Sequence, residues 1–84
     1  EARKDVLRQD LDEHVATLVL YWEKQPGNER SRLEGLAFSI LTSIDGEDGQ
    51  VPGYVLHTLD TNEEVGPWLH ESFVAFLKSM RELA

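Results

Sequence analysis

Two breaks rich in glycine and proline divide this chain into segments that each have room for one helix or one short strand. The first break is Gln25-Pro26-Gly27-Asn28, and the second covers residues 45–53. Proline removes a helical hydrogen bond and glycine permits turn conformations, so a helix is expected to end at each break. With 84 residues and no cysteine, the chain is expected to form one small domain, residues 1–84, without disulfides. A chain of this size buries only about 60–65% of its unfolded surface, so a second chain is one way to complete its stability.

The first segment, residues 2–25, has the pattern of an amphipathic helix. Its apolar residues recur in steps of three and four, which places them along one helical face. They are Leu7, Leu11, Val15, Leu18 and Trp22.

The second segment predicts a helix that begins at Ser31-Arg32-Leu33-Glu34, an S-x-x-E capping box. The apolar residues that follow describe one broad helical face, namely Leu33, Leu36, Ala37, Ile40, Leu41 and Ile44. An alternative interpretation makes residues 38–44 a strand, because Phe, Ile and Thr favour strands. The chain would then contain a helix, a β-hairpin and a helix.

Residues 54–59 are the best strand candidate, because they are rich in β-branched and aromatic residues and lie between turn-forming residues. The strand has no obvious partner in the sequence. It is expected to pair with part of the preceding loop, with the same strand of a second chain, or with a foreign peptide.

The last helix has two possible starts. Thr61-Asn62-Glu63-Glu64 is a second capping box, whereas Pro67 suits the first turn of a helix. We therefore expect a mainly helical α+β domain with three helices and one short strand. The second helix is expected to be central, with the first and last helices packed across its Leu36, Ile40 and Ile44 face.

The net charge of −8 comes entirely from the middle of the chain. Residues 33–77 contain no lysine or arginine and eight acids, and the remaining residues balance to zero. Nucleic acids and anionic membrane surfaces both attract basic segments, so neither is an expected partner. No apolar run approaches the roughly 18 residues of a membrane span.

Metal binding and catalysis find little support in the sequence. Asp10 and His14 lie four residues apart on the predicted first helix, and His70 is a third candidate metal ligand, but no two-histidine zinc spacing is present. An Asp–His ion pair is the simpler interpretation, so no metal and no cofactor are expected. No serine or threonine lies in a strained glycine elbow, so no catalytic residue is assigned.

The acidic loop around residue 45 has the wrong spacing for calcium. Counted from Asp45, the first and third positions are acidic, as in a calcium-binding loop. The glycine that such a loop needs at its sixth position and the acidic ligand at its twelfth are both missing. The expected role is a solvated turn that meets a protein partner. The candidate partner-binding residues are the loop and strand-exit acids together with two strand residues: Asp45, Glu47, Asp48, Glu63, Glu64, Tyr54 and Leu56.

Residues 32–41 read Arg-Leu-Glu-Gly-Leu-Ala-Phe-Ser-Ile-Leu and are followed by Asp45-Gly46 and Pro52-Gly53-Tyr54. This pattern resembles a run in a family of small uncharacterised bacterial proteins, and the resemblance implies a small cytoplasmic bacterial protein. Within the run, Gly35 is expected to let another helix approach closely, at a cost of about 1 kcal/mol in helix propensity.

The function expected from the sequence is that of a small non-catalytic interaction module, including self-association as a homodimer through the strand of residues 54–59 or through an apolar helix face. One alternative is an acidic, immunity-like or decoy-like protein whose carboxylates bind a basic protein partner. A second alternative is a metal-dependent enzyme that uses Asp10, His14 and a distant ligand.

Overall fold

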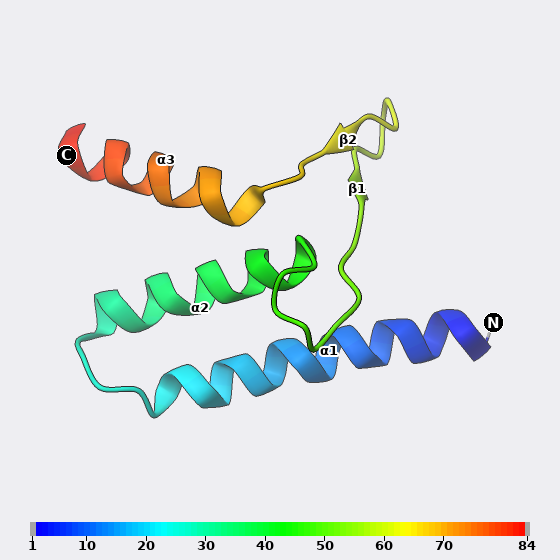
Figure 1. Ribbon diagram of the computed structural model, residues 1–84, viewed down its shortest axis with the longest axis horizontal. Helices are drawn as coiled ribbons and strands as arrows, with labels where there is room; N and C mark the ends of the chain where they lie inside the picture. Colours follow the sequence, from blue (N-terminus) through cyan, green and yellow to red (C-terminus); the bar gives the residue numbers. More distant parts are fainter. Residues whose placement is uncertain (1, 84) are drawn as a thin grey trace.

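The computed structural model describes residues 2–83, which form three helices and a two-stranded hairpin (Figure 1). In chain order the elements are α1 (Ala2–Glu23), α2 (Glu29–Ile44), β1 (Leu56–His57), β2 (Glu64–Val65) and α3 (Leu69–Leu83). The expectation of a mainly helical α+β fold is therefore confirmed. The strand alternative for residues 38–44 is wrong, because this stretch lies inside α2.

The start of α2 lies two residues before the predicted capping box. Asn28 is the N-cap residue, in extended conformation, and its side-chain oxygen accepts a hydrogen bond from the backbone nitrogen of Ser31. Asparagine caps a helix at least as well as serine does. The upstream residue therefore caps α2, and Ser31 becomes part of the first turn instead of the cap.

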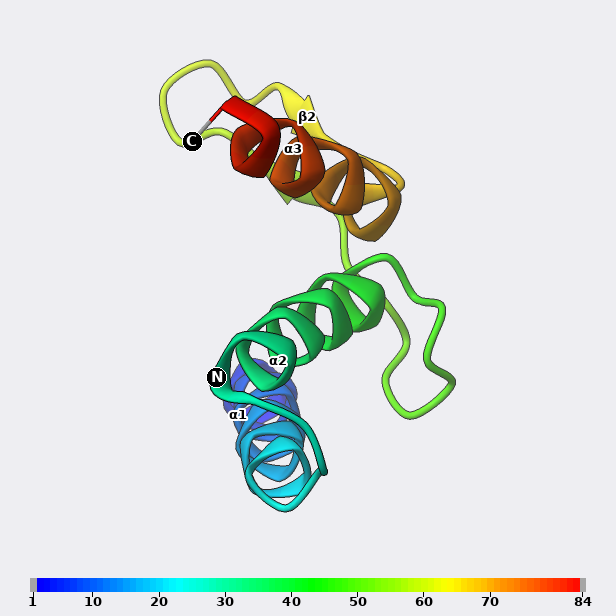
Figure 2. The same cartoon turned by 90° about the vertical axis from the view of Figure 1, so that its left-hand side faces the viewer.

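The three helices lie side by side in a single row with α2 in the middle (Figures 1 and 2). α2 contacts both α1 and α3, whereas α1 and α3 do not meet within residues 2–83. The molecule measures 44 × 34 × 20 Å, and its shortest dimension is perpendicular to the plane in which the three helices are arranged (Figure 1). The central position of α2 is as expected from the sequence.

α1 packs along a line of small residues on α2. Gly35 lies against the indole of Trp22, whose Nε1 donates a hydrogen bond to Ser39 Oγ at 3.0 Å. Ser43, one turn further along α2, meets His14. This line runs beside the Leu36, Ile40 and Ile44 face on which both outer helices were expected to pack. The small side chains let α1 approach more closely than that face would.

The predicted strand at residues 54–59 is shorter than expected and pairs within the chain. β1 and β2 are antiparallel, with Leu56 opposite Val65 and His57 opposite Glu64. Residues 61–64, one predicted start of the last helix, therefore form a turn and the beginning of β2 instead. Positive φ angles at Asn62 and Gly66, 58° and 116°, are incompatible with a helix there. α3 begins at Leu69, two residues after Pro67, and Trp68 between them has a positive φ of 68°. Pro67 therefore precedes the first turn of α3, and the prediction that it lies within that turn is wrong by two residues.

The described part of the chain has no apolar core. Among residues 3–83 the only buried side chain is Ser43, which is 1% exposed, and no apolar side chain is buried. The radius of gyration is 14.6 Å, whereas about 12 Å is typical of a compact domain of this length. A single row of helices therefore leaves much of its apolar surface open.

Candidate functional site

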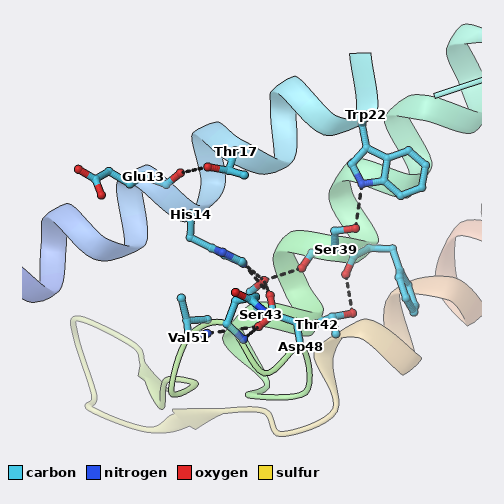
Figure 3. Close-up of polar contacts among 11 residues, drawn as sticks. Glu13, His14, Thr17, Trp22, Ser39, Thr42, Ser43, Asp48 and Val51 are labelled. Carbon is cyan, nitrogen blue, oxygen red and sulfur yellow. Dashed lines mark hydrogen bonds and ion pairs between the residues drawn. The ribbon is translucent and has the colours of Figure 1, made fainter. Parts of the chain in front are cut away.

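Three side chains converge where α1, the end of α2 and the following loop meet (Figure 3). His14 Nε2 lies 2.7 Å from Ser43 Oγ and 2.6 Å from Asp48 Oδ2, and Ser43 Oγ lies 2.5 Å from the same carboxylate oxygen. The other carboxylate oxygen, Oδ1, accepts a hydrogen bond from the backbone nitrogen of Gln50 at 2.9 Å. The cluster fastens the acidic loop to two helices.

A serine, a histidine and an aspartate also make up the catalytic triad of many hydrolases, but the geometry here differs from a triad. In a triad one imidazole nitrogen faces the serine and the other faces the aspartate. Here the same nitrogen, Nε2 of His14, contacts both Ser43 and Asp48. Ser43 is also 1% exposed, so a substrate cannot reach its hydroxyl. The arrangement is suited to holding the loop and not to nucleophilic attack.

The hydrogen bonds keep Asp48 ionised. Partial burial alone would raise the pKa of this carboxyl group, but the Ser43 hydroxyl, the Gln50 amide and the His14 imidazole all lie within hydrogen-bonding distance of it. Together they bring its pKa below the ordinary value of 3.8. The carboxylate is thus a stable anchor for the loop near neutral pH.

A second His–Asp pair joins the end of α2 to the start of α3. Asp45 Oδ2 accepts a hydrogen bond of 2.9 Å from the backbone nitrogen of His70. The same oxygen lies 2.5 Å from Nδ1 of the His70 imidazole. The imidazole also lies edge-on against the ring of Phe38, with 5.4 Å between ring centroids. Burial raises the pKa of Asp45, but the hydrogen bonds from His70 and from the Leu69 backbone, together with the attraction of the imidazole, outweigh burial and bring the pKa below 3.8. The aspartate caps the first turn of α3, as carboxylates do at helix N-termini.

The three candidate metal ligands lie apart. Asp10 is exposed on α1, while His14 and His70 are each hydrogen-bonded to a different aspartate. Within residues 2–83, no three histidine, aspartate or glutamate side chains come together as ligands. The predicted pair of Asp10 with His14 is therefore wrong, because His14 pairs with Asp48, and the pair of His70 with Asp45 was not predicted.

The predicted partner-binding acids fall into two groups. Asp45 and Asp48 are used inside the molecule, with side chains that are 3% and 19% exposed. Glu47, Glu63 and Glu64 are exposed on the loop and the hairpin. The structure therefore leaves three of the five carboxylates available to a partner.

The two predicted strand residues also differ in their surroundings. Tyr54 is half-buried, and its backbone nitrogen donates to the carbonyl oxygen of Ile44 at 2.8 Å. Leu56 is 39% exposed in β1. Because β1 pairs with β2, one edge of this strand is already occupied within the chain.

An apolar surface whose residues were not predicted from the sequence crosses all three helices. Leu33 lines a hollow of about 430 Å³ with Ala37, Phe73 and Leu77, between α2 and α3. The same residue lines a second hollow of about 220 Å³, together with Val19, Trp22 and Leu36, between α1 and α2. Leu33, which is 61% exposed, therefore joins the two hollows into one continuous surface.

Helical spacing extends this surface over α3. Phe76 and Met80 lie three and seven positions after Phe73, on the same side of the helix, and they are 70% and 68% exposed. Val74 and Lys78 lie on the other side and line a separate hollow. We call the continuous surface the apolar face and define it by Val19, Leu33, Leu36, Phe73, Phe76 and Met80.

One sequence signal could have indicated the apolar face. The apolar residues of α3 include Leu69, Phe73, Phe76, Leu77 and Met80, a stripe wider than contact with one neighbouring helix can cover. A wide stripe indicates a helix with two neighbours, and within the described residues α3 packs against only one other helix.

No protein-family model, curated protein or solved structure matches this chain. Its resemblance to a bacterial family therefore stays a prediction. Residues 2–83 include no helix with both the length and the hydropathy that crossing a membrane requires.

Proposed function

We propose that this chain is a small non-catalytic interaction module that binds another protein chain through its apolar face. The observation that carries the proposal is the position of Leu33, which is exposed at the centre of an apolar surface spanning three helices. Contiguous apolar surface of this kind is uncommon on monomeric soluble proteins and marks interaction sites.

The layer architecture supports the proposal. Stable domains bury apolar surface between two or more layers of secondary structure. α1, α2 and α3 form one layer (Figure 2), and none of the apolar side chains in residues 3–83 is buried. A second layer supplied by another chain would cover the apolar face.

The composition of the apolar face also fits an interface. Its centre contains phenylalanine, leucine and methionine, and charged residues lie at its edge. Aromatic residues and methionine are enriched at the centres of protein interfaces, whereas charged residues are depleted there. The edge includes an ion pair of 2.9 Å between Arg81 Nη1 and Glu34 Oε2.

The acidic-partner alternative has less support. Two of its five carboxylates, those of Asp45 and Asp48, are hydrogen-bonded to histidines. Glu47, Glu63 and Glu64 remain exposed, but they lie on the loop and the hairpin and do not belong to the apolar face.

We also propose that the module acts in the cytoplasm, which is consistent with a chain that has no cysteine.

Photo-crosslinking in expressing cells tests the proposal. A photoreactive phenylalanine analogue replaces Leu33 in one variant and Leu20 in a control. The two leucines are similarly exposed, at 61% and 57%, but Leu20 lies outside the apolar face. We expect discrete protein adducts at position 33 and none at position 20. The absence of adducts at position 33 would contradict the proposed function.

A further inference from the structure

We propose that the apolar face is covered by a second copy of this chain, so that two single layers stack into a two-layer homodimer. This inference rests on the proposed function and adds the identity of the partner. Three observations support it: the amount of surface left open, the shape of the apolar face and the charges at its edge.

The chain as a whole exposes more surface than a compact monomer of its mass, by an amount similar to what a stable dimer buries. The chain has an accessible surface of 6642 Å², whereas a compact monomer of 9.6 kDa exposes about 5,100 Å². The surplus is about 1,500 Å². Standard interfaces bury about 800 Å² per partner, and obligate homodimers bury about 1,000–2,500 Å² per partner. Stacking two copies would therefore restore the burial that one copy lacks.

The apolar face carries both a projection and a hollow, as a self-complementary surface requires. In a two-fold dimer the same patch meets itself, so each contact is made twice. Phe76 and Met80 project from α3 with most of their side chains exposed. Beside them lies the hollow lined by Leu33, Ala37 and Phe73. The aromatic side chain of each copy can thus enter the hollow of the other.

The charges at the edge of this hollow cancel. Glu29 and Glu34 are balanced by Arg30 and Arg81, although the chain as a whole carries −8. Two identical surfaces with a net charge would repel each other, whereas a balanced edge lets each acid meet a base of the other copy. A basic or acidic foreign partner would be expected to select an edge of one sign.

Light scattering coupled to size-exclusion chromatography tests the dimer with purified protein over a wide concentration range. We expect the wild-type chain to have twice the monomer mass of 9.6 kDa. Leu33→Glu places a charge at the centre of the apolar face and should halve the mass. Leu20→Glu places the same charge on an equally exposed leucine outside it and should leave the dimer intact.

A second measurement covers the case in which Leu33→Glu does not fold. The chain has no cysteine, so Leu33→Cys introduces one thiol while keeping the position apolar. We expect its labelling by a maleimide to slow as the protein concentration rises, because the dimer covers residue 33. Labelling of a Leu20→Cys control should not depend on concentration.

The outcomes separate this inference from the proposed function. A wild-type chain that stays at 9.6 kDa at every concentration overturns the homodimer. If photo-crosslinking at position 33 then gives adducts only with other proteins, the proposed function stands without self-association. If it gives no adducts, the proposed function and the homodimer both fail. A dimer whose Leu33→Cys labelling is independent of concentration overturns the assignment to the apolar face.

Discussion

Gly35 and Trp22 mark the closest approach of α2 and α1. A Cβ atom at position 35 would lie 2.4 Å from Cη2 of the Trp22 indole and within 2.8 Å of two further ring carbons. Carbon atoms in proteins do not come this close without displacement. The absence of a side chain at position 35 therefore sets the distance between the two helices, and the expectation that this glycine permits close packing is confirmed.

We expect Gly35→Ala to destabilise the chain. Alanine would add about 1 kcal/mol of helix propensity, but overpacking costs about 1–3 kcal/mol, and three indole carbons would have to move. The expected net loss is about 1 kcal/mol in the free energy of unfolding. Urea denaturation followed by tryptophan fluorescence measures it.

A double variant provides the control for this clash. Trp22→Leu removes the ring atoms nearest to position 35, so the double variant Gly35→Ala, Trp22→Leu should lose less stability than the two single variants added together. Additive losses would show that the indole is not what alanine meets.

Ser43→Ala should loosen the acidic loop. The Ser43 hydroxyl is within hydrogen-bonding distance of both His14 and Asp48. Its loss is expected to lower the free energy of unfolding by about 1–2 kcal/mol. Amide hydrogen exchange should become faster in residues 46–53. Ser79→Ala on the exposed side of α3 is the matched control. It should change neither the free energy of unfolding nor the amide exchange of residues 46–53. Unchanged exchange in the loop would contradict the anchoring role of the cluster.

Stability should fall in acid because of Asp45 and Asp48. Both carboxyl groups have a pKa below the ordinary value of 3.8 in the folded chain. Their contribution is therefore complete above pH 3.8 and is lost as the pH falls from there through the lowered folded pKa values. Urea midpoints measured between neutral pH and pH 2 should show this loss.

Asp45→Asn isolates one of the two carboxylates. The variant removes the charge that faces His70 and should lower stability at neutral pH by about 1–3 kcal/mol. Its urea midpoint should also depend less on pH below 3.8 than that of the wild-type chain. An acid dependence identical to that of the wild type would show that Asp45 does not contribute to it.

The sequence predicts the helices well because their periodic apolar residues are a strong signal, but it predicts their ends less well. Asn28 and Ser31 both suit an N-cap, and only the hydrogen bond between them identifies Asn28 as the cap. The second strand, Glu64–Val65, has two residues. A segment that short has no alternating pattern by which to recognise it.

The candidate site is less predictable because its partners lie far apart in the chain. His14 and Asp48 are 34 residues apart, whereas Asp10 lies one helical turn from His14 and is the obvious partner in the sequence. The apolar face has the same limitation. Periodicity shows how wide an apolar stripe is, but the arrangement of α1, α2 and α3 decides which part of it stays uncovered.

Phe76→Ala distinguishes an isolated chain from an assembled one. In the single chain Phe76 is 70% exposed, and truncating an exposed side chain changes stability by about 0.5 kcal/mol or less. In an assembly that covers the apolar face, the same truncation should cost about 3–5 kcal/mol per chain. Denaturation at two protein concentrations measures the difference, with Leu20→Ala as the exposed control. Equal, small effects of the two substitutions would mean that nothing packs against Phe76.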